Sequence, residues 1–402
     1  MDRRANSGRK CCRPPKKGFC SMTTPLEVVI VISFLAYFSF AGDFKAEPTL
    51  RYLSILHRHG ERTPVEDTYP LDPYSNDSFW PEGRGELIKK GTKTLFELGK
   101  FLRQRYDGFI PSKYKASDLL AVSSYKDRCI MSGQALLAGL YPPVDDQIWD
   151  PEVQWQPIPV HPVPPSLDNF FLAQKPCASY KIEKEYVKNT IFQKVQDENQ
   201  ELLEYVNKNA GVMVKSVTEL EDIYDALLIA NEQGLKLPEW AWKVFPEKLK
   251  LMARYSIVSC SWTPTMKKLY SGSLINDVLT NMEKKRDSKD TFKRLLNLYS
   301  GHDYTVINFL ISIGVDQKML PLPDYGATVI LELHEINSKH RVKILYLQYG
   351  LDKNLTVLHI NGCEKDQDTH HDDMCDLDVF ASALHPVRVT DFEKECEIRV
   401  TD

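Results

Sequence analysis

Two patterns of apolar residues alternate along much of the chain. Short continuous apolar runs occur at residues 50–56, 118–124 and 294–300. Each is followed by a segment in which apolar residues recur every three or four positions, at residues 85–106, 126–140 and 304–315. The short runs predict buried strands and the periodic segments predict amphipathic helices. The pattern therefore favours an α/β fold with a mainly parallel central sheet flanked by helices.

Two segments interrupt this alternation. Residues 148–171, IWDPEVQWQPIPVHPVPPSLDNFF, are rich in Pro and Trp and predict an extended surface crossing rather than a regular element. Residues from about 170 to 290 are rich in Glu, Lys, Leu and Asn with helical periodicity, which predicts an inserted helical cap. Further on, alternating runs predict strands that close or cover a sheet edge, at residues 326–334, 341–350 and 355–360.

Charged side chains gather directly after the three predicted strands of the core. They are Arg58, His59 and Arg62 after the first, Asp127 and Arg128 after the second, and His302 and Asp303 after the third. A basic cluster such as 58–62, taken alone, is typical of a solvated loop. Ligands of open α/β sheets, however, bind beyond the carboxyl ends of the strands. The repeated placement therefore favours one convergent anion site.

The residue types in this set suit phosphoryl chemistry. Arginine presents a planar fork of donors that matches phosphate oxygens two at a time, so Arg58, Arg62 and Arg128 are expected to bind a phosphate dianion. A histidine among guanidinium groups should have a lowered pKa and remain a neutral nucleophile, which is the role expected of His59. Asp303 is the carboxyl group best placed to protonate a leaving oxygen.

Composition and charge narrow the partners. The 402 residues are 43% hydrophobic and 26% charged, an ordinary globular composition. The net charge of −4 gives no reason to expect nucleic acid, and the local basic cluster suggests a small anionic ligand. The stretch HHDDM at 370–374 is a candidate metal-ligand cluster, but its acidic, turn-rich surroundings favour a solvated loop. We therefore expect neither a metal nor another cofactor.

The first 42 residues are interpreted as a targeting segment. Residues 1–20 carry seven Arg and Lys against one Asp, and residues 28–42 form an apolar run that ends in small residues. That run is shorter than the roughly 20 residues of a membrane-spanning helix. We expect a cleaved signal peptide over 1–42, with an uncleaved N-terminal signal anchor as the alternative and Met22 as an alternative start. The protein would then be secreted, lysosomal or otherwise lumenal, or tethered to a membrane if the segment is retained.

Entry into the secretory pathway changes the interpretation of the cysteines. Cys11, Cys12 and Cys20 lie in the leader, and the others are Cys129, Cys177, Cys260, Cys363, Cys375 and Cys396. Their pairing cannot be deduced from spacing alone. Sequons at Asn76 and Asn354 are candidate N-glycosylation sites.

Four stretches resemble one known family. RHGERTP at 58–64 resembles the RHGxRxP signature of the histidine phosphatase superfamily, and GHD at 301–303 resembles the second signature of its acid phosphatase branch, branch 2. SYKDRCIMSG at 124–133 and WQPIPVHPVP at 155–164 resemble further blocks of prostatic, lysosomal and insect venom acid phosphatases. The resemblance implies a phosphoglycerate mutase-like domain over residues 48–397.

The resemblance also implies roles for single residues. His59 would take up the phosphoryl group and Asp303 would protonate the leaving alcohol, while the phosphate would be held by Arg58, Arg62, Arg128 and His302. The family's disulfides would pair Cys177 with Cys396 and Cys363 with Cys375; it implies no pairing for Cys129 or Cys260. Two positions depart from the family: His57 replaces an aromatic residue of many relatives, and Tyr125 replaces an aspartate. His57 could be a second polar group in the pocket.

The sequence thus predicts an acid phosphatase that hydrolyses phosphate monoesters through a phosphohistidine. Small molecules, lipids and proteins all offer the same phosphate group, so the substrate is not identified. Two alternatives remain: a catalytically weak secreted binding or antigenic protein on the same fold, or a phosphotransferase of the superfamily. A homodimer is left open.

Overall fold

The computed structural model describes residues 45–396 apart from 66–68, 172–176, 289–290, 353, 361 and 364–372. The expected leader at 1–42 and the first residues of HHDDM, 370–372, lie outside the described residues. No helix among the described residues is long and apolar enough to span a membrane.

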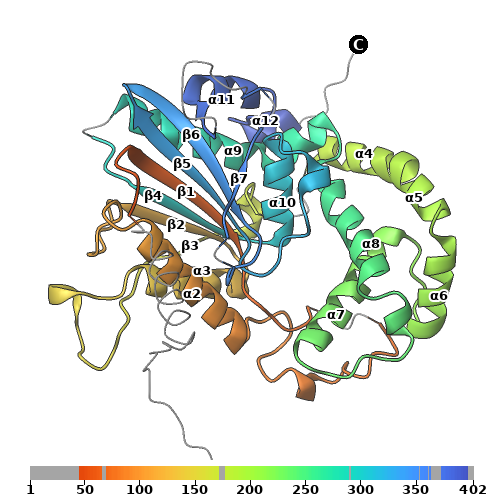
Figure 1. The fold of residues 1–402 in the computed structure, drawn as a ribbon. Coiled ribbons are helices and arrows are strands. Elements are labelled where there is room, and N and C mark those ends of the chain that lie inside the picture. The colour runs from red at the N-terminus through yellow and green to blue at the C-terminus, as the bar shows by residue number, and fades with distance from the viewer. Residues whose placement is uncertain are drawn as a thin grey trace, which may run out of the picture. The chain divides into compact units, whose positions relative to one another are not determined.

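The described residues form one eight-stranded mixed sheet (Figure 1), with the strand order β3-β2-β4-β1-β5-β6-β7 and with β8 paired to β6. One half, β3 to β1, is parallel, and the other half, β5 to β8, is antiparallel. The strands are β1 (Leu50–Arg58), β2 (Leu119–Ser124), β3 (His161–Val163), β4 (Leu296–Gly301), β5 (Thr328–Ile336), β6 (Lys339–Leu347), β7 (Thr356–Leu358) and β8 (Cys375–Asp376). The mainly parallel α/β core expected from the sequence is confirmed for the half of the sheet that carries the site.

The Pro-rich crossing at 148–171 was expected to contain no regular element, and this expectation is wrong for a three-residue strand and for the short 3-10 helix Pro165–Leu167. Residues His161–Val163 form β3, which pairs with β2 at the edge of the sheet. Pro162 lacks a backbone N–H, but an edge strand leaves one side of its backbone unpaired, so the missing donor is tolerated there. The period-2 pattern of a strand is not visible in a segment this short.

The register of the parallel half brings the strand ends together. Arg58 at the end of β1 lies opposite Gly301 at the end of β4, and Ser123 near the end of β2 lies opposite Ser300. Because the strands are parallel, the loops that follow them leave the same edge of the sheet. The charged residues after β1, β2 and β4 therefore converge.

Helices cover both faces of the sheet (Figure 1). Along β1, Leu53 and Ile55 pack with α2 (Lys89–Arg105) and α3 (Asp127–Leu140) on one face. Tyr52 and Leu56 point to the opposite face, which is covered by α9 (Pro264–Asp287), α10 (Asp303–Ser312) and α11 (Leu377–Leu384). This alternation is the period of two expected of a strand that is buried on both sides.

The described part of residues 170–290 is largely helical, as the composition predicted. Its helices are α4 (Ala178–Val187), α5 (Gln193–Asp197), α6 (Gln200–Ala210), α7 (Leu220–Glu232), α8 (Glu247–Val258) and α9. The apolar side chains of α6, α7 and α8 belong to the same buried cluster as those of α9, α10 and the sheet. The helical insert therefore shares its hydrophobic core with one face of the sheet.

Two disulfides have the pairing that the family resemblance implies, one between residues 219 positions apart and one between residues 12 positions apart. Cys177, just before α4, is bonded to Cys396 at the end of α12 (Phe392–Cys396), and Cys363 is bonded to Cys375 in β8. Cys129 and Cys260 are buried thiols without a disulfide partner among the described residues.

His57 lies inside the sheet and is fully buried, with 0% of its surface exposed. Its Nδ1 donates a hydrogen bond of 3.0 Å to the carbonyl oxygen of Arg58, while its Nε2 has no partner among the described residues. Burial lowers the pKa of His57 to about 4. The unfolded chain, with an ordinary histidine pKa of about 6.5, therefore binds more protons than the folded protein between these two values.

This difference predicts a loss of stability as pH falls from about 6.5 to about 4. Replacing His57→Phe should remove this term, which amounts to at most about 3 kcal/mol. Urea unfolding at about pH 7.5 and about pH 4.5 would measure it, and the variant should gain stability relative to the wild type at the lower pH. A constant difference between the two proteins at both pH values would show that His57 titrates normally.

Candidate active site

A cavity of about 610 Å³ lies at the ends of β1 and β4. Its lining contains all six site residues expected from the sequence, which are Arg58, His59, Arg62, Arg128, His302 and Asp303. The structure thus brings together residues that are up to 245 positions apart, from Arg58 to Asp303. Neither His57 nor Tyr125 is among the described residues that line this cavity.

The loop after β1 is fixed by close backbone contacts. A Cβ atom at Gly60 would lie 2.5 Å from the carbonyl oxygen of Gly91 in α2, so only glycine fits between the loop and this helix. The Gly60 N–H donates to Oγ of Ser132 in α3, and the His59 N–H donates to the Gly301 carbonyl. Both flanking helices and the end of β4 therefore hold His59 in place.

His59 lies on the cavity floor with only 2% of its surface exposed. Its Nδ1 is 2.8 Å from the Gly60 carbonyl oxygen, which can only accept, so Nδ1 carries the proton and Nε2 keeps its lone pair. Burial, and then the charges of Arg128 and Arg58, hold the pKa of His59 well below its usual value. His59 is therefore a neutral imidazole in acid solution, with Nε2 available as a nucleophile.

The three arginines are each anchored through Nη atoms. Arg58 donates to the Pro323 carbonyl oxygen at 2.7 Å and to Asp303 at 2.8 Å, and it stacks on the Tyr325 ring. Arg128 donates from Nη1 to the Gly85 carbonyl oxygen at 3.3 Å. Arg62 is held by Asp225, at 3.0 and 3.1 Å. The Nε atom of each arginine is buried without a hydrogen-bond partner among the described residues.

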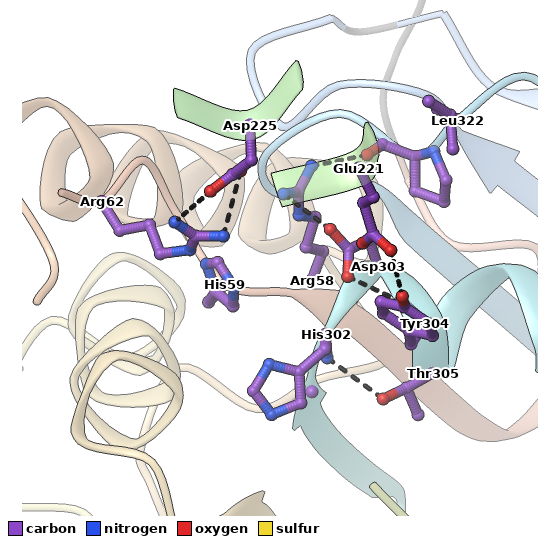
Figure 2. A network of polar contacts seen from close by, with 12 residues as sticks. Arg58, His59, Arg62, Glu221, Asp225, His302, Asp303, Tyr304, Thr305 and Leu322 are labelled. Carbon is purple, nitrogen blue, oxygen red and sulfur yellow. Dashed lines mark hydrogen bonds and ion pairs between the residues drawn. The ribbon is translucent and has the colours of Figure 1, made fainter. Parts of the chain in front are cut away.

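His302 and Asp303 begin helix α10 on the other side of the cavity (Figure 2). His302 Nε2 lies 3.0 Å from Oγ of Ser124, and burial and then Arg128 lower the pKa of His302 to about 3. Burial alone would raise the pKa of Asp303, but Arg58 and Arg62 together hold it below its usual value. Asp303 is thus a carboxylate next to a neutral His302.

The Sγ of Cys129 lies 3.7 Å from both ring nitrogens of His302, and burial raises the pKa of this thiol to about 12.

Several cavity residues were missed from the sequence. Helix α7 contributes Glu221, Tyr224 and Asp225, and α10 contributes Tyr304, whose hydroxyl donates to Glu221 (Figure 2). Burial raises the pKa of Glu221 to about 8, so this carboxyl group is neutral in acid solution. Tyr304 directly follows the GHD motif, so its place in the cavity could have been predicted from the sequence. The α7 residues carry no such signal, because polar residues on one face of a helix usually indicate a solvated surface.

The sequence model of the histidine phosphatase superfamily (branch 2) matches residues 49–347. The chain belongs to this superfamily. It is 31% identical over 356 residues to the lysosomal acid phosphatase of Rattus norvegicus, which covers 87% of this chain and 81% of that protein. It is 32% identical over 389 residues to venom acid phosphatase Acph-1 of Apis mellifera, covering 92% and 93% of the two chains.

Solved structures of two phytases share the fold at lower sequence identity. The phytase of Hafnia alvei in complex with tartrate aligns with a TM-score of 0.63 and 18% identity, over 87% of this chain and 98% of that chain. The phytase of Citrobacter braakii aligns with a TM-score of 0.61 and 16% identity, over 87% and 100%. At this identity the likeness establishes the histidine phosphatase fold and leaves the substrate open.

Proposed function

We propose that this chain is an acid phosphatase that hydrolyses phosphate monoesters through a phosphohistidine on His59. The observation that carries the proposal is that His59, whose Nδ1 is bonded to the Gly60 carbonyl so that Nε2 keeps its lone pair, lines one cavity with three arginines and Asp303. The acid phosphatases among its relatives support the same reaction class.

In the first step, Nε2 of His59 attacks phosphorus and the bond to the leaving oxygen breaks. Arg58, Arg62 and Arg128 stabilise the charge on the phosphoryl oxygens, with His302 as a further donor. Asp303 gives a proton to the leaving alkoxide, so an alcohol departs. In the second step, water attacks the phosphohistidine, Asp303 takes up a proton, and orthophosphate and free His59 are released.

Asp303 must be protonated for the first step, although its pKa is lowered in the free protein. A phosphate monoester has its second pKa near 6, so at lower pH it binds with a proton of its own. Its negative charge also offsets the pull of Arg58 and Arg62 on the Asp303 carboxylate. Both effects favour the reaction at acid pH.

Replacing His59→Ala should reduce turnover of p-nitrophenyl phosphate by at least about 1,000-fold, because the nucleophile is lost. The exposed His385→Ala is a matched control and should retain activity. Addition of EDTA should leave wild-type activity unchanged, since the arginines supply the positive charge. Equal inactivity of wild type and His59→Ala across the acid range would instead support the catalytically weak binding protein.

The role of Asp303 can be separated by the leaving group. Asp303→Asn keeps the shape but has no proton to give, so its loss of kcat should be larger for an alkyl phosphate such as β-glycerophosphate than for p-nitrophenyl phosphate. The difference should be about 10-fold or more, because the nitrophenolate leaves without protonation. An equal loss for both substrates would contradict Asp303 as the proton donor.

We further propose that the mature protein is secreted or lumenal and begins after the leader at 1–42. The lysosomal, prostatic and venom relatives support this location, as do the two disulfides, which form and persist in oxidising compartments. Asn76 and Asn354 are exposed and remain candidate glycosylation sites. N-terminal sequencing of the mature protein should find a start near residue 42 or 43, and a retained segment would indicate the anchor.

A further inference from the structure

Helix α7 faces the cavity with three carboxyl groups, Glu221, Asp222 and Asp225, of which Glu221 and Asp225 lie one turn apart. Figure 2 shows the Asp225 carboxylate opposite the end of the Arg62 guanidinium, joined to it by two contacts. Oδ2 of Asp225 is 3.0 Å from Nη1, and Oδ1 is 3.1 Å from Nη2. This is a bidentate pair between the helical insert and the loop after β1, in which two parallel bonds define the plane of the guanidinium.

The remaining N–H groups of Arg62 show which side of the guanidinium is still available. Of the five donors, one on each Nη atom goes to Asp225, and the second on Nη1 goes to the Thr63 carbonyl oxygen at 3.1 Å. The two that remain are the second hydrogen of Nη2 and the Nε hydrogen, and Nε has no partner among the described residues. These two hydrogens point along one edge of the guanidinium and form a second fork.

We propose that Asp225 is a positioning residue that holds Arg62 end-on, so that its Nε and Nη2 edge is left for the substrate phosphate. The proposal rests on the phosphatase function proposed above. The carboxylate and a phosphate would occupy different edges of the same guanidinium, so they do not compete. A free arginine side chain loses rotamer freedom when it binds a ligand, and an anchored side chain has already lost most of that freedom.

Arg58 follows the same pattern with a different partner. Its Nη atoms bind the Pro323 carbonyl oxygen and Asp303, and its Nε also has no partner among the described residues. The carboxylate of Asp303 takes part in the proposed proton transfer, whereas Asp225 is given no proton to move. Asp225 is therefore expected to affect phosphate binding more than the chemical step.

The test uses Asp225→Asn, which is nearly isosteric but has one acceptor oxygen in place of two. It should raise KM for p-nitrophenyl phosphate and the inhibition constant for orthophosphate by about 10-fold, with a smaller change in kcat. Asp225→Glu, which keeps the charge, should give an intermediate effect. Glu204→Gln is the control, because it likewise converts a carboxylate to an amide, but at an exposed position of α6 that does not line the cavity, and it should change KM less than about 2-fold.

A double-mutant cycle shows whether Asp225 acts through Arg62. In an Arg62→Ala background, Asp225→Ala should cause little further loss of kcat/KM, because the residue that it positions is already gone. Three outcomes would overturn the proposal. They are multiplied effects of the two substitutions, an effect of Glu204→Gln equal to that of Asp225→Asn, and tighter orthophosphate binding by Asp225→Asn.

Orthophosphate binding, measured by calorimetry, separates this proposal from the proposed function. If the wild type binds orthophosphate but turns over no phosphate monoester, the phosphatase function fails while the positioning role can still be judged from the weaker binding of Asp225→Asn. If the wild type is active and Asp225→Asn binds orthophosphate as tightly as the wild type, the positioning role alone fails.

Discussion

The mutual repulsion of Arg58, Arg62 and Arg128 around a buried histidine is the constraint on which this site depends. Buried charges are costly unless they are paired, and like charges at close range add to that cost. The structure pairs two of the three with carboxylates, Arg58 with Asp303 and Arg62 with Asp225, while Arg128 donates to the Gly85 carbonyl oxygen. Two of the three buried charges are therefore compensated in the free protein, and arginine donors remain concentrated around His59.

The same arrangement sets the protonation states that the chemistry needs. Burial and the neighbouring guanidinium groups keep His59 and His302 neutral, and the Gly60 carbonyl selects the His59 tautomer that leaves Nε2 free. The arginines also stabilise Asp303 as a carboxylate until a phosphate offsets their charge. In the proposed mechanism, substrate binding and the protonation of Asp303 are thus linked through one set of charges.

Much of the fold and of the site could be predicted because their signals are local. The apolar runs of β1, β2 and β4 and the helical periods after them are properties of adjacent residues, and parallel strands must end at a common edge. The short edge strand β3 was missed because three residues that include Pro162 show no period. The antiparallel placement of β5 directly beside β1 was not visible either, since strand order depends on pairing between distant segments.

The contribution of α7 to the cavity could not be predicted from the sequence. Glu221, Tyr224 and Asp225 have the spacing of a helical face, and a solvated face has the same pattern as one that lines a cavity. Their contacts with Tyr304 and Arg62 depend on how the helical insert packs against the core. The sequence by itself determined the chemistry of the site, because the residue types and their placement after strands are local features. Only the tertiary structure decided which carboxylates hold Arg58 and Arg62 and which edges of these two arginines stay free, because those carboxylates lie more than a hundred residues further along the chain.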